Sequence, residues 1–113
     1  MDELKEKFNK LTNESSLHEI QDYIKFMIKA RGFDNSTSED FMLLLTEELG
    51  ELAKEVRKST HIKMDINQSR QSNIDKELAD VFIYVLALGI ANNIDVFEAF
   101  KNKEEINFNR KWK

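Results

Sequence analysis

The 113-residue chain contains no cysteine and no proline, and it has only three glycines. The absence of cysteine excludes disulfides, zinc–thiolate sites and thiol catalysis. The absence of proline and the scarcity of glycine leave few residues that would interrupt a helix, so we expect an all-α protein. The two histidines, His18 and His61, do not stand three residues after a glutamate. The Glu-x-x-His element of di-iron bundle proteins is therefore missing.

The chain also lacks an apolar run long enough to cross a bilayer. Its longest run, Val81–Ala91, has eleven residues, and we interpret it as part of a buried core helix. The first residues are charged and do not resemble a signal peptide, which predicts a cytoplasmic protein without a membrane partner. The 17 basic and 21 acidic side chains give a net charge of −4, which argues against general nucleic-acid binding.

The capping and periodicity signals predict one domain over residues 1–113, built as a bundle of four to five helices. Helix starts are expected at four places: Ser16, Ser36 or Thr37, Ser72–Asn73, and Asp95. The helix that begins at Ser16 is expected to end near Arg31–Gly32. Residues 1–15 are expected to form an N-terminal extension or a short helix. Residues 59–72 are polar and show no helical period, so a loop near the functional site is expected there.

The helix expected to begin at Ser72–Asn73 is apolar on nearly every face of its second half. A helix of this kind is normally covered on all sides. A single copy of so small a protein does not readily supply that much covering surface. We therefore predict that dimerisation completes the core, in a homodimer or a dimer of dimers.

Two acidic pairs share the same spacing: Glu48 with Glu51, and Glu77 with Asp80, with Glu47 directly before the first pair. Side chains three residues apart project from one helix face. If the two helices face each other, these carboxylates repel unless a cation lies between them. All-oxygen ligands favour Mg²⁺, with Mn²⁺ as the alternative ion. The competing interpretation is that these are ordinary solvated charges with lysine neighbours.

The segments around these acids carry a resemblance. The segments LLLTEELGELA at 43–53 and ELADVFIYVL at 77–86 resemble the signature of the MazG-like, all-α nucleoside triphosphate pyrophosphohydrolases. The similarity extends over roughly residues 16–112. It implies hydrolysis of a (d)NTP between the α- and β-phosphates, which yields a (d)NMP and pyrophosphate. Some relatives carry tryptophans around the base, where this chain has Phe33 and Lys58, so the base preference stays open.

The resemblance also implies site residues. Four carboxylates match the Mg²⁺ ligands: Glu48, Glu51, Glu77 and Asp80. Glu47 matches the acid that orients or deprotonates the attacking water. Five residues match positions that contact the nucleotide: Phe33 at the base, Tyr84, and the Lys-x-x-x-Asn-x-x-Arg element Lys103, Asn107 and Arg110.

Two other functions are compatible with a helical chain. A non-catalytic oligomerisation or interaction module would explain the apolar helix, but it would leave the paired carboxylates without a role. A di-metal oxidoreductase of the ferritin type would need histidine ligands that the bundle helices lack.

Overall fold

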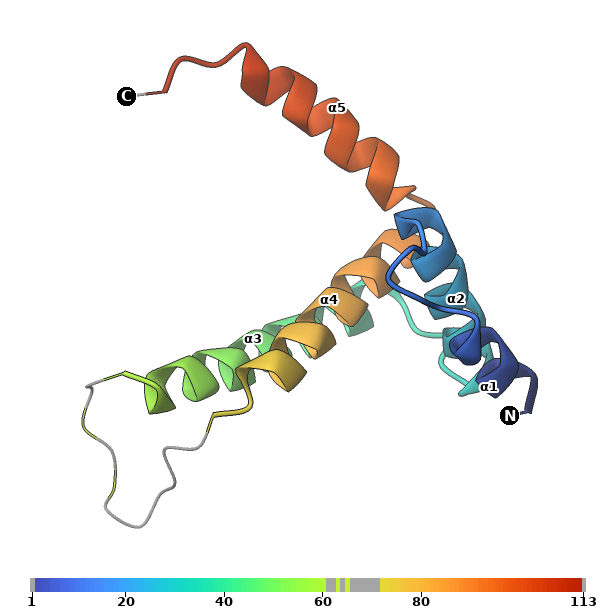
Figure 1. The fold of residues 1–113 in the computed structure, drawn as a ribbon, viewed down its shortest axis with the longest axis horizontal. Helices are drawn as coiled ribbons and strands as arrows, with labels where there is room; N and C mark the ends of the chain where they lie inside the picture. The colour runs from blue at the N-terminus through green and yellow to red at the C-terminus, as the bar shows by residue number, and fades with distance from the viewer. Residues whose placement is uncertain (1, 61–62, 64, 66–71, 113) are drawn as a thin grey trace.

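In the computed structural model, which describes residues 2–60, 63, 65 and 72–112, the chain is helical (Figure 1). Its helices are α1 (Asp2–Asn9), α2 (Leu17–Ala30), α3 (Ser38–Lys58), α4 (Ile74–Ala91) and α5 (Val96–Phe108). The described part of the chain contains no strand, which confirms the all-α fold class. Most of the loop expected at residues 59–72, including His61, lies outside the described residues.

Local side-chain capping explains most of the helix starts. Ser16 and Thr37 each form a capping box. Their side chains accept the backbone N–H of the third helical residue, and the side chain of that residue accepts the backbone N–H of Ser16 or Thr37. Thr37, not Ser36, therefore begins α3. Asp95 accepts the N–H of Glu98 at the start of α5. The side chain of Asn73 makes no such bond at the start of α4.

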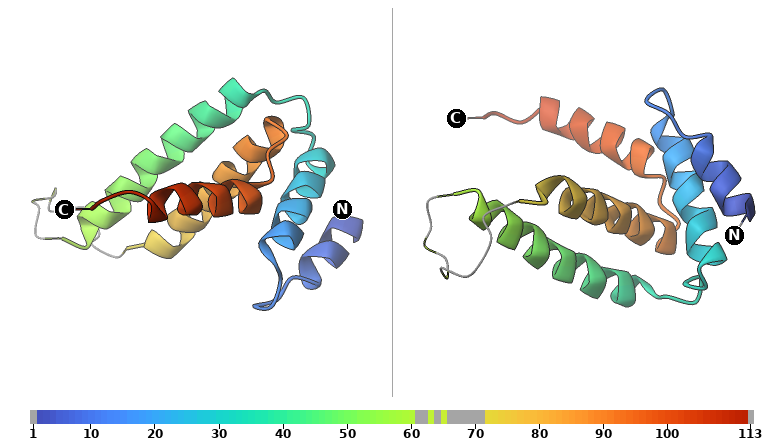
Figure 2. Two further views of the ribbon diagram at one scale, coloured as in Figure 1. Left: turned by 90° about the horizontal axis from the view of Figure 1, so that it is seen from above. Right: turned by 60° about the horizontal axis from the view of Figure 1, so that its bottom comes forward.

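Helices α3 and α4 lie side by side and antiparallel, and α2 packs across the end where α3 begins and α4 ends (Figure 2). Helix α1 packs against α2. Helix α5 contacts α2 and then extends away from the α3–α4 pair (Figure 1). The α3–α4 pair is consequently open on the side from which α5 departs.

The buried core lies where α1, α2, the start of α3 and the second half of α4 meet. Its members are Leu4, Ile24, Met27, Ile28, Phe41, Leu86 and Ala87. Leu86 has no exposed surface, and Leu4 brings α1 into the core with 4% of its surface exposed. The N-terminal residues thus form the short helix, which was one of the two structures expected for them.

Helix α4 is not covered all round by this single chain. Leu78, Phe82 and Val85 are 55%, 44% and 41% exposed and recur at helical spacing, so they form one apolar stripe.

No single helix among the described residues is long and apolar enough to cross a membrane. Only α4 and α5 taken together are long and apolar enough for a membrane span, and they are bent by 96° relative to each other.

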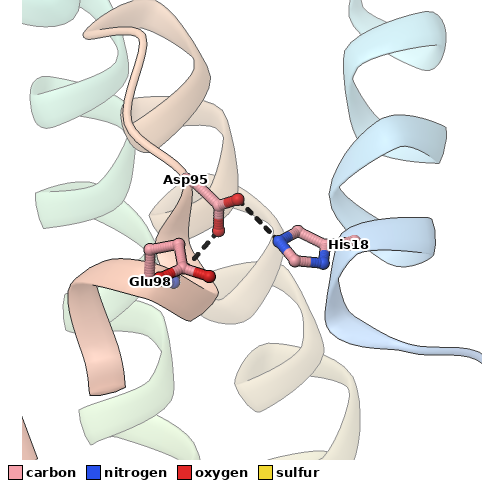
Figure 3. Close-up of side chains that lie close together, drawn as sticks. All are labelled: His18, Asp95 and Glu98. Atoms are coloured by element: carbon pink, nitrogen blue, oxygen red, sulfur yellow. Dashed lines mark hydrogen bonds and ion pairs between the residues drawn. The ribbon is translucent and has the colours of Figure 1, made fainter. Parts of the chain in front are cut away.

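The joint between α2 and α5 sets the direction of α5. His18 Nε2 lies 2.6 Å from Asp95 Oδ2 (Figure 3). Gln21 donates its amide N–H to the carbonyl of Ile94 at 2.8 Å and accepts the N–H of Val96 at 3.0 Å. These contacts hold both sides of the turn from α4 to α5. They give the exposed His18 a structural role at the surface.

Candidate metal centre

Helices α3 and α4 bring three of the four expected metal ligands together. Carboxylate oxygens of Glu48, Glu77 and Asp80 all lie within 4.8 Å of one another. Glu48 comes from α3, and the other two come from successive turns of α4. The antiparallel packing therefore converts two spacings that are far apart in sequence into one group of oxygens.

The electrostatics of this group indicate a missing positive charge. Burial raises the pKa of Glu48 above its ordinary 4.5, and a side-chain hydrogen bond with Glu77 and the negative charges of Asp80, Glu77 and Glu47 raise it further. Within the described residues, none of the three clustered carboxylates forms an ion pair with a basic side chain. Oxygen donors that repel one another and lack a counter-charge fit a hard divalent cation.

The two remaining acids of the motif, Glu47 and Glu51, lie on the exposed surface of α3. Glu51 is not among the three carboxylates that meet within 4.8 Å. Its role as a ligand stays a prediction. The charge of Glu47 contributes to the raised pKa of both Glu48 and Tyr84, so Glu47 lies near the group without belonging to it.

A cavity of about 150 Å³ opens beside the carboxylates. Asp80 and Tyr84 line it from α4, and Phe33 and Arg31 line it from the end of α2 and the turn that follows. Burial, and then the charges of Glu48, Asp80 and Glu47, raise the pKa of the Tyr84 hydroxyl. Two of the residues expected at the nucleotide, Phe33 and Tyr84, thus share one cavity with an expected metal ligand.

Arg31 is a charged residue of this cavity that the sequence pattern did not single out as a site residue. Arg31 is the C-cap residue of α2, and Gly32 follows it with a φ of +81°, a conformation suited to glycine. The sequence marked this position only as a helix end. The sequence did place Arg31 two residues before Phe33, an expected base-contacting residue. That proximity points to the site only when the turn after α2 is known to face α4.

The three residues expected to contact phosphates or sugar are not brought to the carboxylates within this single chain. Lys103 and Asn107 lie on α5, which leads away from the α3–α4 pair, and Arg110 follows its end (Figure 1). The guanidinium of Arg110 lies 4.5 Å from the ring centre of Trp112. Among the described residues, Asn107 Oδ1 is a buried oxygen without a hydrogen-bond partner.

A second group of possible ligands lies at the joint between α2 and α5. His18, Asp95 and Glu98 bring ligand atoms within 4.8 Å of one another, and all three residues are exposed (Figure 3). The carboxylate of Asp95 is already engaged by His18 and by the backbone N–H of Glu98. These bonds account for the cluster as a helix-capping arrangement.

The comparison with known proteins identifies the family. No curated protein matches the chain. Residues 36–106 match the MazG nucleotide pyrophosphohydrolase domain. The matched segment contains all of α3 and α4 and most of α5, and hence the whole group of carboxylates. Because this match extends over more than half of the chain, the chain belongs to the MazG nucleotide pyrophosphohydrolase domain family.

Proposed function

We propose that this protein is a Mg²⁺-dependent nucleoside triphosphate pyrophosphohydrolase that converts a (d)NTP into a (d)NMP and pyrophosphate. The observation that carries the proposal is the meeting of Glu48, Glu77 and Asp80 within 4.8 Å beside an aromatic-lined cavity. The family match supports the reaction class. We place the activity in the cytoplasm, where nucleoside triphosphates are available.

The ion would be held by Glu48, Glu77 and Asp80, with Glu51 as a further ligand from the next turn of α3. These oxygen donors suit Mg²⁺, and Mn²⁺ accepts the same donor set. When bound, the ion would offset the charge of the triphosphate and polarise a phosphoryl oxygen.

The chain's own side chains would perform the remaining tasks. Glu47 is exposed next to the group and can accept a proton from the attacking water. Phe33 offers a face on which the base can stack, and Tyr84, which lines the same cavity from α4, can contact the nucleotide. No nucleophilic side chain is required, because water attacks the phosphorus directly.

The departing pyrophosphate needs positive charge, and we propose that a second copy of the chain is needed to supply it. Lys103, Asn107 and Arg110 are the residues expected to contact the phosphates, but α5 leads away from the α3–α4 pair that carries the carboxylates (Figure 1). The exposed stripe on α4 offers an apolar surface for self-association. A homodimer or dimer of dimers could place one copy's α5 near the other copy's carboxylates.

The proposal is tested by pyrophosphate release from a panel of dNTPs and NTPs in the presence of Mg²⁺. We expect Asp80→Asn and Glu51→Gln to lower kcat/KM by more than about 100-fold, the upper end of the effect typical of residues that only support metal ligands. Glu6→Gln removes an exposed charge on the distant α1 and should retain the wild-type rate.

Equal background rates for the wild type and both ligand variants would contradict the enzyme function. That result would favour the non-catalytic helical interaction module, for which the apolar stripe on α4 is the supporting observation.

A further inference from the structure

Glu55 is the only buried charged residue among the residues that the structure describes. It lies in α3, one turn after Glu51, and 5% of its surface is exposed. Burying a carboxylate is costly unless partners replace its hydration. The metal centre does not include Glu55, so its burial calls for another explanation.

The partners of Glu55 lie at the point where α3 ends and α4 begins. Its Oε2 lies 2.9 Å from Lys58 Nζ, and its Oε1 accepts the backbone N–H of Asn73 at 2.8 Å. The hydroxyl of Ser72 donates to the backbone carbonyl of Glu55 at 3.3 Å. The hydrogen bonds from Lys58 and Asn73 hold the pKa of Glu55 below its ordinary 4.5, despite its burial. The carboxylate is therefore charged and fully engaged.

This contact completes a cap that is only partly local, in which the hydroxyl of Ser72 accepts the N–H of Ile74 at 3.2 Å. Asn73 is the N-cap residue of α4, yet its own side chain accepts no N–H from the first turn. The N–H groups at a helix start need acceptors and favour negative charge. Here the negative charge comes from a neighbouring helix. Glu55 thereby ties the beginning of α4 to a defined position on α3.

The Glu55–Asn73 contact lies at the same distance along α3 and along α4 from the carboxylates of the metal centre. Glu55 follows Glu48 by seven residues, and Asn73 precedes Asp80 by seven residues. Because an α-helix rises about 1.5 Å per residue, the tie lies roughly 10 Å from the carboxylates along both helices. A slip of α4 by one residue would turn Glu77 and Asp80 by about 100° away from Glu48.

We propose that Glu55 is a positioning residue, which fixes the register of α4 on α3 so that Glu77 and Asp80 meet Glu48. The three carboxylates repel one another before an ion binds, and this repulsion works against the register. The Glu55–Asn73 contact, two helical turns from the carboxylates, holds the register against this repulsion. This inference rests on the metal site of the proposed function.

The first test measures Mg²⁺ binding by calorimetry on the full chain, without nucleotide. Glu55→Leu keeps the volume but removes both acceptors, and we expect Mg²⁺ binding to weaken by at least about 10-fold. Glu55→Gln keeps an oxygen for the Asn73 N–H, and its affinity should stay within about threefold of wild type. Glu55→Asp keeps the charge but is one methylene short, so it should weaken binding as Glu55→Leu does.

The control is Leu4→Ala, which removes a core side chain of α1 and lowers the melting temperature without touching the α3–α4 register. The folded Leu4→Ala protein should bind Mg²⁺ as the wild type does. If Glu55 served stability alone, Glu55→Leu and Glu55→Asp would bind Mg²⁺ as tightly as Leu4→Ala does. That outcome would overturn the proposal.

A second readout does not depend on the ion. Because the chain has no cysteine, spin labels can be placed at Glu39→Cys on α3 and Lys76→Cys on α4, both exposed. We expect Glu55→Leu to shift or broaden the label–label distance measured by pulsed electron resonance, and Glu55→Gln to leave it unchanged. An unchanged distance in Glu55→Leu would contradict the inference. A wild type that binds no Mg²⁺ would instead contradict the proposed function and leave this readout valid.

Discussion

At the scale of single residues, α3 shows how environment separates the properties of identical side chains. Glu48 and Glu55 stand seven residues apart, yet the pKa of Glu48 is raised and that of Glu55 is lowered. Glu48 is partly buried among other carboxylates, whereas Glu55 has Lys58 and the Asn73 N–H as partners. Among the described residues Glu48 therefore has no positive partner, whereas Glu55 has Lys58 within the chain.

We predict that Glu48→Gln removes the response of the protein to Mg²⁺ without destabilising the ion-free fold. At an Mg²⁺ concentration of 100 times Kd, the wild type should gain about 2.7 kcal/mol in the free energy of unfolding, and the variant should gain almost none. Without the ion the variant should be at least as stable as the wild type, because the substitution relieves repulsion. Calorimetric melting with Mg²⁺ or a chelator measures both effects. A variant that Mg²⁺ still stabilises fully would exclude Glu48 as a ligand.

The same pKa shifts predict how stability depends on pH. The lowered pKa values of Glu55 and Asp95 mean that their ionised forms stabilise the fold above a pH of about 4.5, and that this stability is lost as the pH falls further. The raised pKa of Glu48 has the opposite sign, because protonation relieves repulsion in the folded chain. In chelator, stability should thus rise from neutral to mildly acidic pH and then fall.

Urea unfolding at a series of pH values measures this profile. Glu48→Gln should lose the rise at mildly acidic pH, and Glu55→Gln should lose part of the fall at lower pH. Wild-type profiles in both variants would show that these two groups do not set the pH dependence.

At the scale of helices, the glycines show why similar positions differ in what they tolerate. A Cβ on Gly89 would lie 2.6 Å from a methyl carbon of Val96, at the close approach between the end of α4 and the start of α5. A Cβ on Gly50, within α3, would meet nothing within 4 Å. Gly89 thus permits the sharp turn into α5, whereas Gly50 only weakens a helix.

We therefore predict opposite effects of the same substitution. Gly89→Ala should lower the free energy of unfolding by about 1–3 kcal/mol, because the stiff Val96 side chain cannot move aside without cost. Gly50→Ala should raise it by about 0.5–1 kcal/mol, as alanine is the better helix former. Chemical denaturation of the two variants measures the contrast. A loss of stability in Gly50→Ala equal to that in Gly89→Ala would contradict this account of both sites.

At the scale of the whole molecule, a single chain leaves much apolar surface uncovered. In addition to the stripe on α4, Met42, Leu49 and Val56 recur every seven residues on α3 and are each 44–48% exposed. Two apolar stripes on neighbouring helices are more than a soluble monomer usually exposes. We expect two copies to associate through these stripes.

We predict that the wild type is a dimer or a tetramer and that Phe82→Glu makes it a monomer, because a charge in the centre of the α4 stripe cannot be buried without a partner. Analytical ultracentrifugation measures the state. The control is Leu43→Glu, a similar change at a 70% exposed position outside the α3 stripe, which should leave the assembly intact. A wild-type chain that sediments as a monomer at high concentration would refute the predicted association.

Several features of this fold were readable in the sequence because they depend on neighbours along the chain. The caps at Ser16 and Asp95 and the helix end at Arg31–Gly32 were predicted where the structure has them, and Thr37 is one of the two caps predicted for α3. The start of α4 was predicted at its correct place, and Ser72 accepts the N–H of Ile74 there, but the N–H of Asn73 is accepted by Glu55, a residue of another helix. Local capping rules could not reveal that contact.

The candidate metal centre likewise has features that the sequence predicted and features that only the structure shows. Helical spacing by itself placed each acidic pair on one face. The motif indicated the MazG-like family, and the match over residues 36–106 confirms the family. Only the packing of α4 on α3 determined that the carboxylates of Glu48, Glu77 and Asp80 meet within 4.8 Å, a group that does not include Glu51. Only the turn after α2 brought Arg31 and Phe33 to the cavity beside Asp80. Spacing along a helix follows from a fixed rise and rotation per residue, whereas the register between two helices depends on contacts far apart in the chain.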